Sequence, residues 1–355
     1  MEDKSGASEP KYKRRKRSET FEDVYPEITI MDRLHQQKNV SRVNDAIFNG
    51  KPEILKFYMN LKGERRQRKV NFNRNLHGQT LFHAACAHAS KEIVSLFLEY
   101  AEELAIDLNV RSGIRGLTPF MSAPWRKQII ELLLNDQRIE VNLKNHKGES
   151  LLYNAFMVQH ASDSSSKMSH EMSSGCFFNY VGCKGNCDDM DKFETLLKCQ
   201  RFDWTTSDNN GVTLLHLACA KKCEMKVKFL LSIASDKGID VNAKDLHGRT
   251  PLHYISHASH FLRYDKSRTQ NSKQEFFPIE ELFLKYSTKL PINFDAVDNN
   301  GETFLHMTFK HHIQTHVRAF IQVAKDVYKK EFNVSLRNHF GLTPLDIAVS
   351  KRSIF

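Results

Sequence analysis

The chain has 355 residues, of which 40% are hydrophobic and 26% charged, and its formal charge is +10. These proportions are ordinary for a protein with a buried core, and 15 glycines and 9 prolines are too few for a collagen-like or low-complexity chain. No long apolar run exists, so we expect no transmembrane helix and no association with a membrane. No apolar stretch follows the polar N-terminus, so we expect no secretory signal. The odd count of 7 cysteines indicates reduced thiols in the cytosol or nucleus.

The excess positive charge lies near the N-terminus. Residues 1–77 contain 18 bases and 11 acids, whereas the other 278 residues contain 34 bases and 31 acids. Too few apolar residues surround the first basic cluster for it to fold alone, so we expect residues 1–39 to form a basic disordered tail. The cluster comprises Lys11, Lys13, Arg14, Arg15, Lys16 and Arg17.

This cluster is typical of a nuclear import signal, and we expect a protein of the nucleus, the cytoplasm or both. A solvated tail that no receptor binds is one alternative. A tether to nucleic acid is another, and it is disfavoured because no aromatic residues are interleaved with the bases to stack on nucleotides.

Two short helices are predicted next, over Val43–Gly50 and Glu53–Met59. The basic segment Gly63–Lys69 follows as their outgoing loop. This pair has the spacing of the units described below without their opening motif, which is common for the terminal unit of a repeat array.

An eight-residue motif then recurs along the chain. It reads GQTLFHAA from Gly78 and returns as GVTLLHLA from Gly211 and as GRTPLHY from Gly248. Weaker copies begin at Gly116, Gly148, Gly301 and Gly341. The Gly of the motif suits the turn, a Thr at the third position can cap a helix, and Pro, in the copies that have it, fits the first helical turn.

Each copy predicts a pair of helices. An apolar run begins thirteen residues after Thr80 and again after Thr213, and a segment such as Asp240-Val241-Asn242 ends the unit. A single unit cannot bury the apolar face of its helices, so the units are expected to stack.

The motif, the second apolar helix and the Asp-Val-Asn ending resemble the ankyrin repeat. The resemblance covers residues 40–355 and implies about eight repeats. The implied fold is all-α, a solenoid of stacked helix-turn-helix units with β-turn fingers. The chain is also similar, more distantly, to the repeat arrays of the inhibitor-of-NF-κB family, which bind transcription factors.

Two long intervals between motifs predict insertions. One spans residues 159–190, after a first helix at Leu151–Val158 and before a second helix at Phe193–Lys198. The other spans residues 260–275, ahead of a helix that contains Ile279–Leu284. By contrast, the unit that opens at Gly116 is about two residues short between its helices.

The last motif copy, from Gly341, has no second helix before Phe355. The sequence therefore predicts either an open apolar edge or one that a partner or missing sequence covers.

Histidine recurs at one position of the motif, in His83, His216, His253 and His306. Each lies about one repeat from the next, so they cannot converge on one metal ion. The family resemblance implies that each makes hydrogen bonds within and between repeats, which is a structural role.

The first insertion contains Cys183 and Cys187 at a spacing that a zinc site would tolerate, but no second close pair follows. We expect a polar loop there, and Ser162 and Ser164–Ser166 make phosphorylation a further hypothesis. No phosphate-binding loop, nucleophile elbow or carboxylate pair is present, so we expect neither an enzyme nor a cofactor. Cys86, Cys219 and Cys223 fall at small-residue positions and are expected in the core.

The resemblance implies that turn tips and first helices line a concave surface that binds a partner protein. Leu76, Leu246 and Phe340 are the expected apolar anchors if they are exposed, and packing on neighbouring turns is the alternative. Few acids occur at the tips, which favours an acidic or neutral partner segment. The predicted partner-binding residues are Leu76, His77, Arg115, His146, Lys147, Asn209, Asn210, Leu246, His247, Asn299, Asn300, His339 and Phe340.

We therefore expect a protein-interaction scaffold of the nucleus, with a transcription regulator among its candidate partners. A substrate-recruiting adaptor of a ubiquitin ligase is the alternative, together with a protein tethered to nucleic acid by its basic tail.

Overall fold

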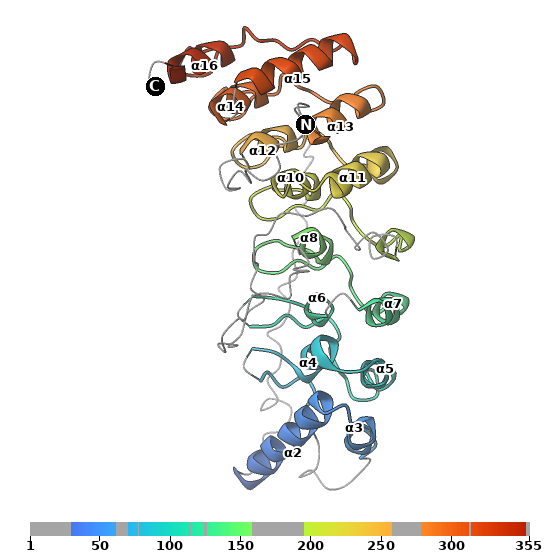
Figure 1. Ribbon diagram of the computed structural model, residues 1–355. Helices are drawn as coiled ribbons and strands as arrows, with labels where there is room; N and C mark the ends of the chain where they lie inside the picture. Colours follow the sequence, from blue (N-terminus) through green and yellow to red (C-terminus); the bar gives the residue numbers. More distant parts are fainter. Residues whose placement is uncertain are drawn as a thin grey trace, which may run out of the picture.

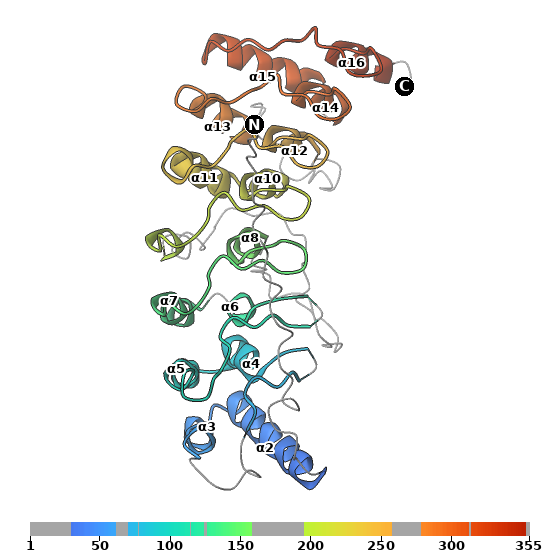
Figure 2. The same ribbon diagram turned by 180° about the vertical axis from the view of Figure 1, so that it is seen from behind.

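The computed structural model describes residues 30–61, 70–76, 78–113, 115–123, 126–157, 195–257, 278–311 and 314–352. The helices lie in two columns along an elongated stack (Figures 1 and 2). One column holds the first helix of each repeat and the other holds the second. The turns that open the repeats project beyond the first helices, away from the second helices.

The first-helix column comprises α2 (Ile30–Phe48), α4 (Leu81–His88), α6 (Pro119–Ser122), α8 (Leu151–Met157), α10 (Leu214–Ala220), α12 (Pro251–His257), α14 (Phe304–His311) and α16 (Pro344–Arg352). The second-helix column comprises α3 (Pro52–Met59), α5 (Lys91–Glu99), α7 (Lys127–Asn135), α11 (Glu224–Lys237), α13 (Pro278–Tyr286) and α15 (Gln314–Asp326). Each first helix packs on the next first helix, which confirms the predicted all-α solenoid.

The seven motif glycines occupy the left-handed region, with φ between 67° and 90°. Each lies in the turn just before a first helix, as the motif predicts. Isolated β-bridges close several of these turns, for example Ser207 with Thr213 and Val297 with Thr303. The turns are therefore the β-turn fingers expected from the sequence.

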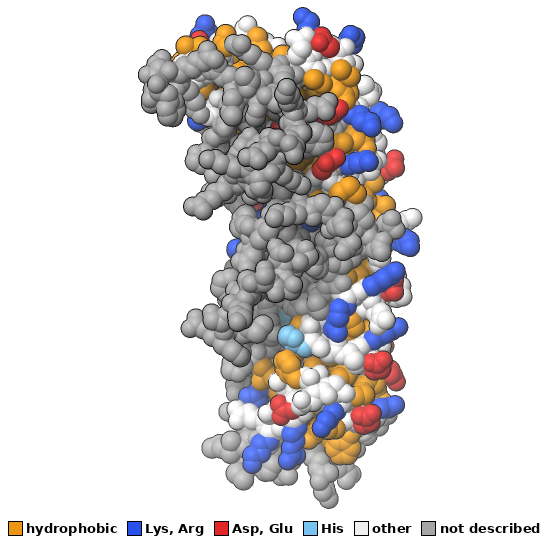
Figure 3. Space-filling view, viewed as in Figure 1, with side chains coloured by type: hydrophobic (Ala, Val, Ile, Leu, Met, Phe, Trp, Pro, Cys, Tyr) orange, Lys and Arg blue, Asp and Glu red, His pale blue; other side chains and the backbone are white. Residues whose placement is uncertain are grey.

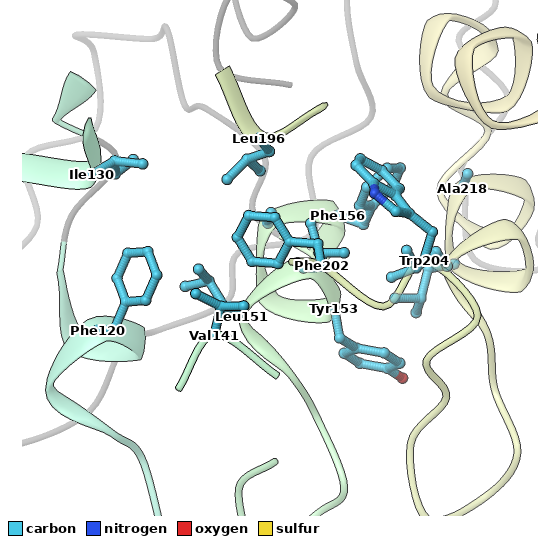
Figure 4. Packing of buried hydrophobic residues seen from close by; sticks show 14 of the residues in the cluster. Phe120, Ile130, Val141, Leu151, Tyr153, Phe156, Leu196, Phe202, Trp204 and Ala218 are labelled. Carbon is cyan, nitrogen blue, oxygen red and sulfur yellow. The ribbon is translucent and has the colours of Figure 1, made fainter. Parts of the chain in front are cut away.

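One apolar core runs through the stack from Val40 to Ala348. Figure 4 shows it around the fourth repeat, where Phe156 of α8 lies near Phe202 and Trp204. Residues 195–198 are helical and supply the fully buried Leu196, so the second helix predicted at Phe193–Lys198 is present in its described part. Cys86, Cys219 and Cys223 are buried, as expected.

Two elements differ from the expected boundaries. Helix α2 begins at Ile30, inside the segment predicted as tail, because residues 30–39 contain no Gly or Pro to end a helix. Helix α6 has only four residues, which reflects the short spacing of its repeat. Within the described residues, α16 has no second helix beside it. The predicted insertions at 159–190 and 260–275 lie outside the described residues.

Candidate protein-binding surface

In five of the described fingers, one side chain fixes the backbone of the turn. Oδ1 of Asp245 accepts hydrogen bonds from the backbone N–H groups of His247 at 2.9 Å and Arg249 at 2.8 Å. Because an Asp or Asn side chain can stand in for a backbone carbonyl in a turn, this pair of bonds gives the tip one defined conformation. Equivalent pairs are made by Asn145, Asp208, Asp298 and Asn338.

Main-chain hydrogen bonds join each tip to the next. The N–H of Asn209 donates to the carbonyl of Lys147, and the N–H of Leu246 donates to the carbonyl of Asn210, both at 2.9 Å. Matching bonds link His146 to Arg115, Asn299 to His247 and His339 to Asn300. We call this set the tip row: Arg115, His146, Lys147, Asn209, Asn210, Leu246, His247, Asn299, Asn300, His339 and Phe340.

Glycine is required where the tips approach each other. A Cβ on Gly148 would overlap the side chain and backbone of Asn209, and one on Gly248 would overlap Asn299. Both glycines also have positive φ, +80° and +72°. The motif glycine therefore both forms its own turn and allows the next one to pack against it.

The motif histidines join each first helix to the following finger. Nδ1 of His216 accepts the N–H of Thr213 at 3.1 Å, so its proton is on Nε2, which donates to the carbonyl of Arg249 at 2.9 Å. His83, His253 and His306 make the same two bonds, with the carbonyls of Leu117, Glu302 and Leu342 as acceptors. The predicted structural role is confirmed.

Burial lowers the pKa of these four histidines and is the largest influence on each. They are therefore neutral at pH 7. In the fourth repeat Tyr153 replaces histidine, and its hydroxyl donates to Oδ2 of Asp208 in the next finger at 2.9 Å. Burial raises the pKa of Tyr153, which keeps it a donor.

The tip row places the predicted binding residues side by side with their side chains exposed. Leu246 is 67% exposed and Phe340 is 77% exposed, so both are available as apolar anchors. Leu76 is instead half-buried and packs on the core, because its N–H and carbonyl both pair with Gln79 in a tight bridge. His77 lies outside the described residues.

The charged side chains of the tip row, Arg115 and Lys147, are both basic. Carboxylates do lie at the bases of three fingers, at Asp208, Asp245 and Asp298. Of these, Asp245 is buried and bonded to Arg249 at 2.7 Å and to the hydroxyl of Tyr254 at 2.8 Å. Burial favours protonation of Asp245, but these bonds outweigh it and hold its pKa below the ordinary value. Asp245 therefore stays ionised and paired, and does not oppose an acidic partner.

Sequence reasoning did not single out Arg249 or Tyr254. Both residues directly follow a motif residue, Gly248 or His253, and this position in the motif could have indicated them. The second-helix face differs from the tip row, because Figure 3 shows basic and acidic side chains interspersed along that edge.

Asparagines make a second ladder, in the loops that leave the second helices. Nδ2 of Asn142 donates to the carbonyl of Arg201 at 2.7 Å, and its Oδ1 accepts the N–H of Asp203 at 2.9 Å. Asn73, Asn109 and Asn242 bind the following repeat in the same way. Two ladders thus link neighbouring repeats, one at the finger tips and one in the loops that leave the second helices.

The described residues contain no group of three or more His, Cys, Asp or Glu side chains arranged to hold a metal ion. None of the described helices is long and apolar enough to span a membrane. The cluster from Lys11 to Arg17, and Cys183 and Cys187, lie outside the described residues.

A family model described as ankyrin repeats (3 copies) matches residues 43–145 and 181–264, which is just over half of the chain. An ankyrin repeat protein of Variola virus, OPG189, is 34% identical over 140 residues, or 39% of this chain and 20% of the viral protein. A putative glutaminase 2 of Caenorhabditis elegans is 34% identical over 84 residues, or 22% of this chain and 13% of that protein. The chain thus spans a fifth or less of these relatives.

Among solved structures, the ankyrin repeat domain of Bcl-3 has a similar fold. The TM-score is 0.52 at 19% identity, and the match covers 78% of this chain and 97% of the Bcl-3 chain. Ankyrin repeats are protein-interaction modules and typically carry no enzymatic activity. On the evidence of the repeated motif, the stacked helix pairs and the family match, the chain belongs to the ankyrin-repeat family and is a protein-interaction scaffold.

Proposed function

We propose that the tip row holds a segment of a transcription regulator and that the complex forms in the nucleus. The observation that carries the proposal is the continuity of the tip row, in which backbone bonds fix exposed side chains from Arg115 to Phe340. Two large apolar side chains, Leu246 and Phe340, lie in this polar row. Interfaces gain most of their energy from such anchors surrounded by polar contacts.

Three features support the kind of partner. The solved ankyrin domain of Bcl-3, a member of the IkappaB protein family, shares the fold. The basic cluster Lys11–Arg17 has the composition of an import signal. The bases of the tip row suit a segment that is acidic or neutral.

Alanine at both Leu246 and Phe340 tests the tip row. We expect this double variant to lose the proteins that co-purify with the wild-type chain. Met225→Ala is the matched control, because Met225 is an exposed apolar residue of α11 on the second-helix face. Quantitative mass spectrometry of the captured proteins gives the comparison, and an unchanged set with the double variant contradicts the proposed surface.

The nuclear assignment needs its own test. Residues 1–25 fused to a fluorescent protein should accumulate in the nucleus. Alanine at Lys13, Arg14, Arg15 and Lys16 should abolish that accumulation, because it removes the block of like charge that import receptors read. Cytoplasmic retention of the unmodified fusion rejects this part of the proposal and leaves the tip row untouched.

A further inference from the structure

From the fifth to the eighth repeat, the fingers of the tip row alternate between two kinds of exposed side chain. Leu246 and Phe340 are large and apolar, and their fingers are separated by a single finger. The finger between them exposes Asn300, and the finger before Leu246 exposes Asn210. An amide and an apolar anchor therefore follow each other along the row.

Neither anchor owes its exposure to the end of the stack. Leu246 lies in an interior finger, with further repeats on both sides. Phe340 occupies the tip position of Asn210, His247 and Asn300, and these three side chains are exposed although another finger follows each of them. A further finger would therefore leave Phe340 exposed as well.

Leu246 occupies a finger position at which asparagine can link two repeats. Asn209 and Asn299 hold the same position in their own fingers, and Nδ2 of each donates at 3.0 Å to a carbonyl of the preceding finger. Leucine has no donor, so the carbonyl of Asn209 receives no such bond from Leu246. A stabilising link given up at an exposed position indicates a residue that serves binding rather than folding.

The exposed amides of the row suit the backbone of a partner. The amide of Asn210 makes no hydrogen bond to the rest of the described chain, and that of Asn300 makes one, a 3.4 Å bond from Nδ2 to Asp298. An amide offers donors and an acceptor together, which match the N–H and C=O groups of a peptide. A helix satisfies its own backbone groups, whereas an extended segment leaves them unpaired. The alternation therefore favours an extended partner segment.

The packing of the first helices sets the spacing of the residues in that segment. Helices α12, α14 and α16 pack in succession, and packed helices lie about 8–10 Å apart. The fingers of Leu246 and Phe340 are two repeats apart, which corresponds to about 16–20 Å. An extended chain advances about 3.3 Å per residue, so about six residues cover this distance, and an even number keeps both side chains on one face.

We propose that the tip row binds an extended segment in which two large apolar residues, about six positions apart, contact Leu246 and Phe340. This inference rests on the proposed function and names the chemistry of the partner. The backbone of the segment midway between the two residues bonds to the amide of Asn300. Lys147 lies two fingers before Leu246, so an acidic residue about six positions beyond the residue that contacts Leu246 completes the pattern.

Selection from a phage-displayed library of random peptides tests the proposal on the full chain. We expect the enriched sequences to share two large apolar residues about six positions apart, with Asp or Glu about six positions further to one side. A helix would need about 11–13 residues to cover the same distance. Enriched apolar pairs at the helical spacing, or no enrichment at all, overturn the proposal.

An enriched peptide labelled with fluorescein then gives affinities by fluorescence anisotropy. Leu246→Asn should weaken binding about tenfold or more, because it removes an apolar anchor, and Phe340→Asn should do the same. The first variant also keeps the array folded, since its new amide can donate to the carbonyl of Asn209. Met225→Ala, on the second-helix face, is the matched control and should leave the affinity unchanged.

A change in the peptide tests the extended conformation. Insertion of one residue between the two apolar positions should also weaken binding about tenfold, because it turns one of the side chains to the opposite face.

The outcomes separate this inference from the proposed function. Enriched peptides whose affinity changes in neither asparagine variant contradict the tip row as the binding surface. Peptides that require Leu246 and Phe340 but carry the helical spacing, or tolerate the inserted residue, overturn the extended segment and leave the tip row in place.

Discussion

The buried histidines act as neutral connectors between repeats. His216 uses one ring nitrogen as an acceptor within its own helix start and the other as a donor to the next finger. Both bonds require the neutral ring with its proton on Nε2, since protonation of Nδ1 would remove the acceptor and add a buried charge. The same side chain thus links local helix capping to repeat stacking.

The stability of the array should fall as the pH drops below about 6.5, the pKa of histidine in an unfolded chain. Burial depresses the pKa of His83, His216, His253 and His306 in the folded state. Below pH 6.5 the unfolded chain therefore binds protons that the folded chain does not, and this loss continues until the pH passes the folded-state values. The slope approaches about 1.4 kcal/mol per pH unit for each histidine.

Urea unfolding between pH 7.5 and 5 measures this slope. In His216→Gln the proton uptake on unfolding should be lower by about one over the same range, although the variant is less stable at pH 7.5. A slope equal to that of the wild type would show that His216 is not held neutral by the fold.

Among the elements, the asparagine ladder has a gap between the fourth and fifth repeats. Thr205 occupies the position of Asn142 and Asn242, and its hydroxyl bonds instead to Asp203 of its own loop at 2.6 Å. Next to it, Nε1 of Trp204 and Oγ1 of Thr206 are buried polar atoms without a hydrogen-bond partner in the described structure. Among the described residues, this junction therefore lacks the asparagine link that Asn142 and Asn242 make at the neighbouring junctions.

Thr205→Asn should stabilise the array by about 0.5–1.5 kcal/mol, the usual net value of added hydrogen bonds. By analogy with Asn109, the new amide would donate to the carbonyl of Gly238 and accept the N–H of Asp240. Chemical denaturation measures the change.

The reverse substitution, Asn242→Thr, is the matched control. It removes the bonds to Pro291 and Asn293 and should destabilise the array by about 1–2 kcal/mol. A Thr205→Asn variant that is not stabilised, or an Asn242→Thr variant as stable as the wild type, would contradict the role assigned to the asparagine ladder.

For the whole molecule, each repeat is too thin to bury its own apolar face and depends on the units beside it. The single core from Val40 to Ala348 reflects this dependence. One motif position consequently has different energetic weight at different places in the stack. The side chain at this position is fully buried at Phe82 and Leu215 and 55% exposed at Leu345, on α16.

The substitutions Leu215→Ala and Leu345→Ala measure how much the same motif position contributes to the free energy of unfolding in two different repeats. Leu215 is fully buried, so its truncation should cost about 2–5 kcal/mol, whereas truncation of exposed Leu345 should cost less than about 0.5 kcal/mol. Equal losses in urea unfolding would mean that another part of the protein covers Leu345 in solution.

The sequence predicted the features that repeat. The motif glycines, the histidine bonds and the helix pairs each depend on a local pattern that recurs, so they could be read without coordinates. The partial burial of Leu76 could not be predicted from the sequence, because the direction of its side chain depends on a bridge to Gln79. The start of α2 at Ile30 was missed because composition suggested a tail while nothing local ends the helix. The tips form a row because the repeats stack, and the sequence implies that stacking geometry only through its resemblance to a known family.

Site-specific photocrosslinking shows whether the tip row holds a partner protein. A benzoylphenylalanine placed at Leu246 or at Phe340 would be irradiated in cells, with the same residue at Met225 as the control on the second-helix face. If the tip row holds a partner, both tip positions should capture the same protein and position 225 should not. Capture from position 225 alone, or of unrelated proteins from the two tips, would contradict it.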